Sequence, residues 1–499
     1  MLSGDRLVFW ALNLSDFVRS EQVEQKLNAG VKHPENPVLA PRPGHWDGTR
    51  CKVYGTVFYD REDSMLKMWY SGSEDTPDSI RREYGSYRHV GYAVSPDGVH
   101  WDRPNLGLIE YRGSKENNII VLNAQAPSVF KGLDCPGIDS AYVMFTQAGQ
   151  DTVETRVLFS DDGARWAVRK DNATGKGEWG VKSHEPFSIL YDPDEPKPDF
   201  RWKGYSLVHV FRNGYRGRAV GFYHGATPFE WTEWERQPIM DTSFALESEI
   251  HIPHVTRFHD DYVMLYDAME PWHDTQTEIA LSRDGIGFER VRNGVPIVTR
   301  GRPDQHDAAK VCVSPRSLFV HDGKIWWYYT TSANNYQTCP RSGRAEPWYR
   351  YTCLAQWRQD GFAHLQTTAG GRSAMVETIP FELLSDDLDV RFNVLSPSPM
   401  KVEFLDETGR KLAVGRLPAG DSLSEPVAWD GEPKVGRGTT ARLRFHLNGP
   451  KARFYSVSVA GAKRASCGVR RLVAAVELDC RIVKQMKFTR AGRSGVEPP

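Results

Sequence analysis

The sequence lacks several features that would assign it to a class at once. Its apolar residues form no uninterrupted run long enough to cross a bilayer, so no membrane partner is expected. The 63 Lys and Arg residues are balanced by 64 Asp and Glu residues, which gives no support for a nucleic-acid partner, because such partners usually require a clustered basic face. The seven cysteines show no Cys-x-x-Cys spacing, so we expect mostly free, buried thiols and no metal site.

The first residues also lack the pattern of a secretory leader. Residues 1–6 contain no basic segment followed by a long apolar one, and the apolar stretch 7–18 is interrupted by Asn13 and Asp16. We therefore expect no signal peptide in this chain. The sequence leaves open both the localisation and whether the chain forms a homo-oligomer.

A short phrase recurs along the first three quarters of the chain. Ser95-Pro-Asp-Gly-Val-His-Trp101 returns as Ser160-Asp-Asp-Gly-Ala-Arg-Trp166 and as Ser282-Arg-Asp-Gly-Ile-Gly-Phe288, with a related segment at 227–231 and a degenerate copy at 359–362. The first four starts are separated by roughly 55–67 residues, the length of a supersecondary unit that must pack against its neighbours. Asp-Gly before an aromatic residue predicts a tight hairpin turn whose ring folds back onto the sheet.

Predicted strands surround each phrase. An apolar, aromatic-rich strand comes before it in every unit, at residues 66–70, 141–145, 204–208, 262–266 and 324–329. In most units another strand comes earlier still and ends in an acidic turn residue, as at Asp60, Asp192 and Asp322. Five units of this kind fill residues 41–367 and predict an all-β fold, a five-bladed β-propeller. The alternative is a β-sandwich in which the repeat is accidental.

The two ends of the chain read differently from the repeat. Residues 368–460 contain segments that alternate apolar and polar side chains, which predicts a C-terminal antiparallel β-sandwich with one wet face on each sheet. Residues 1–40 predict an N-terminal arm with a short helix near 20–27. Residues 461–499 are rich in Lys and Arg and predict a poorly ordered basic tail.

A propeller of five such units followed by a sandwich resembles the five-bladed glycoside hydrolases of families 32, 68, 43 and 62. The stretches 388–394, 401–409 and 442–447 resemble the C-terminal module of family 32, and the whole chain is similar to bacterial proteins described only as family-32-like. The resemblance covers about residues 40–457. It implies a carbohydrate substrate, hydrolysis of a glycosidic bond and no cofactor. The family 32 motifs Asn-Asp-Pro-Asn, Arg-Asp-Pro and Glu-Cys are absent, so a fructan substrate is not implied.

Glycoside hydrolysis requires two carboxyl groups placed on opposite sides of the anomeric carbon. In a propeller, acids that come just before the innermost strands meet in one polar funnel. Acids or histidines occupy this register in four of the five units. The predicted catalytic residues are Asp47, Glu185, Glu247, Glu249 and Asp307.

Roles within this set follow from chemistry. A general acid needs a raised pKa, which favours Glu249 because apolar Ile250 follows it. Glu247 is the rival, since both glutamates fall on the same face of a strand. Asp47 is predicted as the base or nucleophile, because nearby Arg50 would keep it ionised. The two remaining acids would orient the substrate or tune the others.

Substrate contacts are predicted from side chains that stack on sugars or donate to hydroxyls, namely Trp46, Arg50, His184, His251 and His306. Trp46 is equally suited to packing within a blade. One alternative function is a glycoside phosphorylase or transglycosylase, which would need a phosphate cradle beside a single acid. Such a cradle could be supplied by Arg50, Arg82, Arg88 and Arg316. The other alternative is a non-catalytic glycan-binding propeller, whose acids would lie apart or face solvent.

Overall fold

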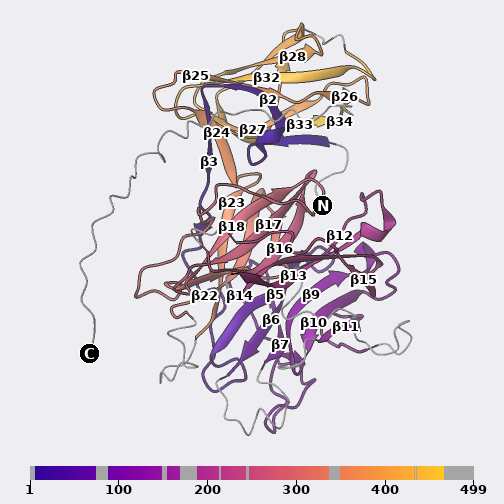
Figure 1. Ribbon diagram of the computed structural model, residues 1–499, viewed down its shortest axis with the longest axis vertical. Helices are drawn as coiled ribbons and strands as arrows, with labels where there is room; N and C mark the ends of the chain where they lie inside the picture. The colour runs from indigo at the N-terminus through magenta and orange to yellow at the C-terminus, as the bar shows by residue number, and fades with distance from the viewer. Residues whose placement is uncertain are drawn as a thin grey trace, which may run out of the picture.

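The computed structural model describes residues 6–74, 88–148, 154–168, 188–212, 215–242, 247–335, 349–431, 433 and 435–465. Within these ranges all regular structure is β-strand, apart from three short 3-10 helices, η1 (Leu14–Asp16), η2 (Gly132–Asp134) and η3 (Pro198–Phe200). The predicted all-β class is confirmed. Over the same ranges, no helix has the length and apolar character to cross a bilayer. Figure 1 shows the repeat region, whose strands span residues 50–358, below two packed sheets formed by both ends of the described chain; residues 363–367, predicted as the end of the repeat, belong to one of these two sheets.

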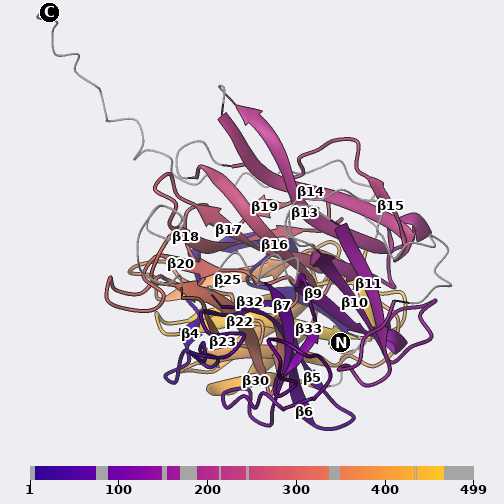
Figure 2. The ribbon, with the colours of Figure 1, turned by 90° about the horizontal axis from the view of Figure 1, so that it is seen from below.

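The repeat region consists of four mostly antiparallel sheets. The first contains β5 (Arg50–Asp60), β6 (Met65–Ser73), β7 (His89–Ser95) and β8 (Ile119–Val121). The second contains β9 (Ala124–Lys131), β10 (Tyr142–Ala148) and β11 (Glu154–Ser160). The third contains β12 (Ser188–Tyr191), β13 (Trp202–Arg212), β14 (Tyr215–Thr227) and β15 (Glu230–Glu233). Figure 2 shows the long β13–β14 hairpin projecting beyond its neighbours.

The fourth sheet joins two repeat units through a parallel pairing of Thr275 with Lys310. Its strands are β16 (Glu249–Phe258), β17 (Asp261–Met269), β18 (Thr275–Ser282), β19 (Glu289–Arg290), β20 (Lys310–Cys312), β21 (Leu318–His321), β22 (Lys324–Ser332), β23 (Tyr351–Arg358) and the N-terminal β4 (Val31–Lys32). We name the repeat units one to five as β5–β8, β9–β11, β12–β15, β16–β19 and β20–β23. The predicted aromatic-rich strands coincide with the second strand of units one to four, and in unit five with β22; only residue 141 falls outside, just before β10.

The recurring phrase forms the same turn each time, as its residue types predict. Ser95 Oγ accepts a hydrogen bond from Gly98 N at 2.8 Å, and Asp97 Oδ1 accepts one from Val99 N at 2.8 Å. Gly98 has a φ of +77°, a conformation that favours glycine. Trp101 Nε1 then donates to Gly98 O at 3.0 Å, which folds the ring back onto the turn. Equivalent bonds form at Ser160, Asp162, Gly163 and Trp166, and the serine and aspartate bonds recur at Ser282, Asp284 and Gly285.

In units one, two and four this turn also attaches the unit to the one before it in the ring. Three turn carbonyls accept a hydrogen bond from a buried side chain of another unit: Gly163 O from Trp69 Nε1 at 2.7 Å, Gly285 O from Tyr205 Oη at 2.9 Å and Gly98 O from Tyr328 Oη at 2.8 Å. The last of these connects unit one with unit five. The first and last units are therefore neighbours, as a closed ring requires.

The first strands of the units meet in the middle of the repeat region. Thr56 Oγ1 donates to Pro127 O at 2.8 Å, which links units one and two. Ser188 Oγ donates to Pro315 O at 3.2 Å and accepts from Val255 N at 2.9 Å, which links units three, five and four. Buried hydroxyls thus satisfy backbone groups where the strands converge.

The remaining strands form what we call the two-sheet module. One sheet contains β1 (Arg6–Trp10), β3 (Val23–Leu27), β24 (Ala363–Thr367), β27 (Val390–Ser396), β30 (Gly420–Pro426) and β33 (Arg453–Ala460). The other contains β2 (Phe17–Glu21), β25 (Ser373–Thr378), β26 (Phe381–Leu383), β28 (Met400–Asp406), β29 (Lys411–Leu417), β31 (Ala428–Trp429), β32 (Thr440–Asn448) and β34 (Ala462–Arg464). A single apolar core that includes Phe9, Phe392, Phe445 and Phe454 fills the space between them.

The N-terminal segment corrects one prediction. The expected helix near 20–27 is wrong, because residues 23–27 pair as a strand with β24 and residues 17–21 pair with β25. The arm is therefore built into the two-sheet module, and among its described strands β4 is the one that pairs with a strand of the repeat region. The predicted tail begins with β34, and its residues from 466 onward lie outside the described ranges.

Candidate functional site

Most of the predicted site residues lie where the first strands of three units begin. They are Trp46, Asp47 and Arg50 at the start of β5, Glu247, Glu249 and His251 at the start of β16, and His306 and Asp307 just before β20. Each group precedes the point where its unit meets the others, marked by Thr56, Val255 and Pro315. Glu185 and His184 fall outside the described residues, as does Arg82.

Asp47 is enclosed by partners. Its carboxylate is 0% exposed, and Oδ1 accepts a hydrogen bond from Arg42 Nε at 3.2 Å. Oδ2 accepts from Arg103 Nη1 at 3.0 Å and from Tyr70 Oη at 2.8 Å. Two guanidinium groups therefore neutralise the carboxylate in the interior. A substrate would reach Asp47 only if one of these arginines moved.

Asp307 occupies the same place in a second copy of this loop. Gly301 N donates to Asp307 O at 3.2 Å, as Arg42 N donates to Asp47 O at 3.4 Å. The buried Asp307 carboxylate pairs with Lys32 Nζ at 2.5 Å. Packing of a repeated loop is thus sufficient to explain why an acid recurs in this register.

The residue before each of these acids packs inside the molecule. Trp46 is 3% exposed, stacks on Tyr70 with ring centroids 5.6 Å apart, and donates from Nε1 to Asn118 Oδ1 at 3.0 Å. A Cβ atom on Gly72 would lie only 2.3 Å from its ring. Trp46 therefore presents no open face to a sugar. His306 Nδ1 lies 3.1 Å from Thr331 Oγ1, and burial lowers the pKa of this histidine.

The two glutamates of unit four have different surroundings. Glu247 forms a two-pronged ion pair with Arg290, whose Nη2 lies 2.9 Å from Oε2, and its side chain is 2% exposed. Glu249 is 12% exposed and lies 3.6 Å from Arg218 Nε. Alternation in the sequence places both on one face, and Glu249 is the more exposed of the two.

Cationic side chains from three units gather around His251. Arg218 Nη1 donates to His251 Nε2. Burial lowers the pKa of His251 well below its usual value, and the charges of Arg218, Lys310, Lys52 and Arg350 lower it further. His251 is consequently neutral near pH 7. Burial also lowers the pKa of Lys310 to about 8, with Arg350 adding to the effect.

Asp267 was not among the residues predicted from the sequence. It lies opposite His251 in the β16–β17 pairing and is fully buried. Its Oδ1 accepts a hydrogen bond from Val313 N at 2.7 Å, whereas Oδ2 has no hydrogen-bond partner among the described residues. Burial raises the pKa of Asp267 well above its usual value and so favours the protonated carboxyl group. The sequence does carry a sign of this residue, because Asp267 is an acid inside an otherwise apolar strand, where a charged residue is rarely buried without a partner.

Over the described ranges, no group of three or more His, Cys, Asp or Glu side chains is placed to hold a metal ion. The four cysteines that lie in these ranges are all free thiols, and Cys51, Cys135 and Cys353 are buried.

Comparison with known proteins reveals distant structural likenesses only. No protein-family model matches the chain, and no curated protein matches it significantly. The fructofuranosidase of Schwanniomyces occidentalis is similar at 11% identity and a TM-score of 0.40, over 88% of this chain and 100% of that one. A thermostable family-43 glycoside hydrolase is 14% identical over 66% of this chain and 92% of that one, with a TM-score of 0.41.

The β-1,2-mannobiose phosphorylase of Listeria innocua is also similar, at 11% identity and a TM-score of 0.45, over 66% of this chain and 96% of that one. The solved structures similar to the chain thus include glycoside hydrolases and a disaccharide phosphorylase. At this distance no activity, substrate or residue role is transferred from these proteins to this chain.

Proposed function

We propose that the protein is a glycoside-cleaving enzyme in which five units form a β-propeller, the two-sheet module is a β-sandwich, and Glu249 is a catalytic carboxylate. The contrast among the predicted acids carries this proposal. Asp47, Glu247 and Asp307 have side chains that are at most 4% exposed and are held by short ion pairs. Glu249 is the most exposed of these four, at 12%, and it lies beside the cationic groups around His251.

The role of Glu249 has two versions. The sequence predicts a general acid, which must carry a proton when the substrate arrives. The ion pair with Arg218 uses the carboxylate form, which suits a base or nucleophile. The sequence predicts Asp47 as the second carboxylate of the reaction, with Glu185 and Asp307 as orienting or tuning acids. Contacts with the substrate remain predictions for five side chains: Trp46, Arg50, His184, His251 and His306.

Turnover of a glycoside panel tests the proposal. Aryl-glycosides and oligosaccharides are incubated with the wild type, Glu249→Gln and the matched control Glu247→Gln. We expect hydrolysis of at least one compound, and a loss of about 10²-fold or more in Glu249→Gln with an unchanged melting temperature. Glu247→Gln should mainly lower stability, because it removes the buried partner of Arg290. Binding of a glycan without any turnover would contradict catalysis and favour the glycan-binding alternative.

A phosphorylase is the second candidate, and the cationic cluster favours it. Lys52, Arg218, Lys310 and Arg350 all act on His251, and their charges suit a phosphate dianion beside a single acid. In such a reaction a phosphate oxygen bonds to the anomeric carbon as the glycosidic bond breaks, and the acid protonates the leaving oxygen. These residues differ from the predicted cradle, in which Arg316 is stacked on Phe130 at 3.9 Å.

Phosphate dependence separates the two candidates. A phosphorylase would release a sugar phosphate only when inorganic phosphate is supplied, whereas a hydrolase would release free sugar in either buffer. Because Lys310 loses its charge above a pKa of about 8, phosphate affinity should fall as the pH rises through this value. Lys310→Met should remove this step in the pH profile. Equal turnover with and without phosphate would exclude phosphorolysis.

A further inference from the structure

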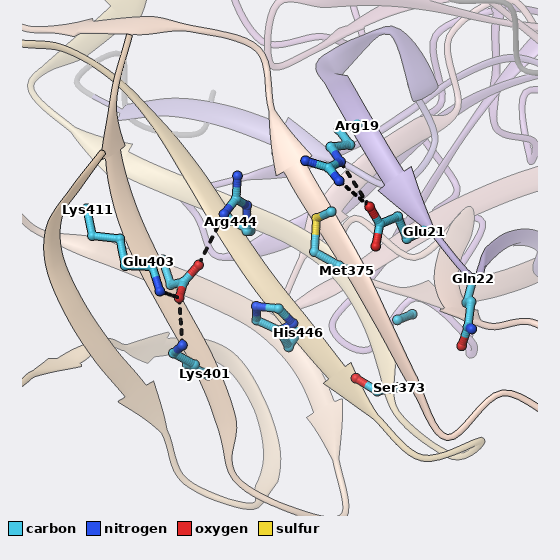
Figure 3. A pocket seen from close by; sticks show the side chains of 11 residues that line it. Arg19, Glu21, Gln22, Ser373, Met375, Lys401, Glu403, Lys411, Arg444 and His446 are labelled. Atoms are coloured by element: carbon cyan, nitrogen blue, oxygen red, sulfur yellow. Dashed lines mark hydrogen bonds and ion pairs between the residues drawn. The ribbon is translucent and has the colours of Figure 1, made fainter. Parts of the chain in front are cut away.

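A groove of about 550 Å³ lies on the outer face of the two-sheet module (Figure 3). Its floor is formed by the sheet that contains β2, β25, β32, β28 and β29, on the side that faces away from the core. Alternation in β32 explains this, since Leu443, Phe445 and Leu447 point into the core and Arg444 and His446 point outward. The groove lies outside the five repeat units and outside the candidate catalytic site.

Charged side chains form a cross-strand row beneath the groove. Pairing places Arg19 opposite Glu377, Glu377 opposite Arg444, and Arg444 opposite Glu403. Arg444 Nη2 lies 2.7 Å from Glu377 Oε2, and Arg444 Nη1 lies 3.5 Å from Glu403 Oε2. Opposite charges on adjacent strands stabilise one another, so the row fixes the positions of these groups.

Glu403 holds more cations than it can neutralise. Lys401 Nζ lies 2.6 Å and Lys411 Nζ 2.7 Å from the same buried oxygen, Oε1 (Figure 3). The lysine side chains remain 45% and 52% exposed, so their outer faces meet solvent. Four cationic residues and two carboxylates line the groove, which gives an excess of two positive charges: Arg19, Lys401, Lys411 and Arg444 against Glu21 and Glu403.

The other residues that line the groove make some classes of ligand a poor fit. No Trp, Tyr or Phe lines the groove, so stacking on a neutral sugar or a nucleobase has no platform. Ser373, Gln22 and His446 supply hydrogen-bonding groups. Burial lowers the pKa of His446; the charge of Glu403 opposes this shift, and the smaller effects of Lys401 and Arg444 add to it.

We propose that this groove binds an acidic polysaccharide through the carboxylate groups of its sugar residues. Lys401 and Lys411, held side by side by Glu403, match the two oxygens of a carboxylate. The groove volume lies within the usual range for ligand sites. Exposed ion pairs are individually weak, so several charges along one chain are needed for useful affinity. The choice of a glycan over other polyanions rests on the proposed function.

Retardation of the native protein in gels that contain polygalacturonate tests this inference, with neutral galactan as the reference. The test variant is Lys401→Ala/Lys411→Ala. The matched control is Lys115→Ala/Lys324→Ala, which removes the same charge from two exposed positions of the repeat region. Lys401→Arg/Lys411→Arg keeps the charge and guards against a folding defect. Each variant is also compared with the wild type by its melting temperature.

We expect polygalacturonate to retard the wild type and galactan to leave it unaffected. The alanine pair should lose affinity by about 10-fold or more, the control and arginine pairs should bind as the wild type, and added NaCl should weaken binding. Equal binding by the alanine pair and the wild type would overturn the inference. Equal retardation by a DNA duplex of similar charge, lost in the same variant, would reassign the groove to polyanions in general. Chondroitin sulfate, as a further arm, distinguishes sulfate from carboxylate recognition.

The result does not depend on catalysis. Turnover of small aryl-glycosides is measured for the same variants and should not change, because such compounds do not extend to the groove. Loss of glycan binding in the alanine pair of a protein that shows no turnover would support the groove and contradict the proposed enzyme. Turnover of aryl-glycosides, together with glycan binding by the alanine pair that equals that of the wild type, would support the proposed enzyme and contradict the groove as a binding site.

Discussion

Tyr142 of unit two donates its hydroxyl hydrogen to Asp60, the last residue of the first strand of unit one, at 2.7 Å. Asp60 also accepts hydrogen bonds from Lys67 Nζ at 2.8 Å and from Lys131 Nζ at 2.6 Å. The sequence predicts Asp60 as a turn residue, and its Oδ1 does accept from Glu62 N at 3.2 Å. The same carboxylate therefore shapes a turn and ties two units together. Asp192 repeats the arrangement with Arg257 and Tyr262 of the following unit.

Substitutions at this link should separate its two contributions. Tyr142→Phe removes one hydrogen bond to a charged acceptor and should cost about 1.5–3 kcal/mol of unfolding free energy. Asp60→Asn removes the buried counter-charge of Lys67 and Lys131, which keep only their more exposed partners Asp63 and Glu62, and should cost more, about 3–5 kcal/mol. Urea denaturation of both variants measures the difference. A larger loss for Tyr142→Phe than for Asp60→Asn would show that the ion pairs contribute little.

The repeated turn gives a second prediction, at Gly98. A Cβ atom there would lie 2.5 Å from Tyr328 Oη and 2.7 Å from the Trp326 ring, and φ is +77°. Gly107 is the matched control, because its φ is +63° and its Cβ would meet nothing within 4 Å. Both alanine variants bear the conformational penalty of about 1–2 kcal/mol, and Gly98→Ala should lose about 1–3 kcal/mol more through overpacking. Equal melting temperatures for the two variants would contradict the contact between units one and five.

The groove gives a prediction about pH. Burial alone would raise the pKa of Glu403, but hydrogen bonds from Lys401 and Lys411 lower it to about 2. The unfolded value is about 4.3, so the unfolded state binds more protons between these limits. Glu403 therefore stabilises the fold above about pH 4.3, and this contribution disappears as the pH falls toward 2.

Thermal unfolding of Glu403→Gln should show this dependence. The variant should be less stable than the wild type at pH 7, and the two should converge near pH 2. Glu21→Gln serves as the control, because the Arg19–Glu21 pair is exposed and should matter little at any pH. A Glu403→Gln difference that is constant from pH 7 to pH 2 would rule out ionisation as its source.

Local sequence patterns predicted the strands and turns well, because the interactions that form them involve residues close together in the sequence. The Ser-x-Asp-Gly phrase carries the whole hydrogen-bonding scheme of its turn, and period-two alternation identified β27, β28, β32 and β33. The N-terminal strands were missed because their partners are remote. Leu27 pairs with Ala363 and Phe17 with Thr378, and nothing near residues 17–27 signals that edge.

The candidate site was harder to predict, because burial of a carboxylate depends on cations from distant parts of the chain. Asp47 is covered by Arg103, and Asp307 by Lys32, so acids that share a register with Glu249 have different accessibility. Lys310 and Asp267 carry shifted pKa values only because the strands around them enclose both. The position of an acid within the repeat can suggest candidate residues. Its ion-pair partners and its exposure in the folded protein then determine which candidates a substrate could reach.

Kinetics on two kinds of leaving group decide the role of Glu249. If it is the general acid, Glu249→Gln keeps the shape of the side chain and removes the proton that the leaving oxygen needs. The rate should then fall by about 10²–10⁴-fold on glycosides with poor leaving groups. The loss should shrink on an activated aryl-glycoside, whose leaving group needs little protonation. Equal losses on both substrates would instead assign Glu249 as the base or nucleophile, the role that its ion pair with Arg218 suits.

Asp47→Asn is the companion variant in these kinetics. A base or nucleophile is needed whatever group leaves, so this change should reduce turnover of both substrates. The buried pairs with Arg42 and Arg103 add a second effect, because a neutral amide in place of the carboxylate would leave two guanidinium groups without a counter-charge and lower stability by about 3–5 kcal/mol. The melting temperature separates the two effects. A destabilised Asp47→Asn that retains full turnover below its melting temperature would make Asp47 structural, and the second carboxylate would then be sought at Glu185.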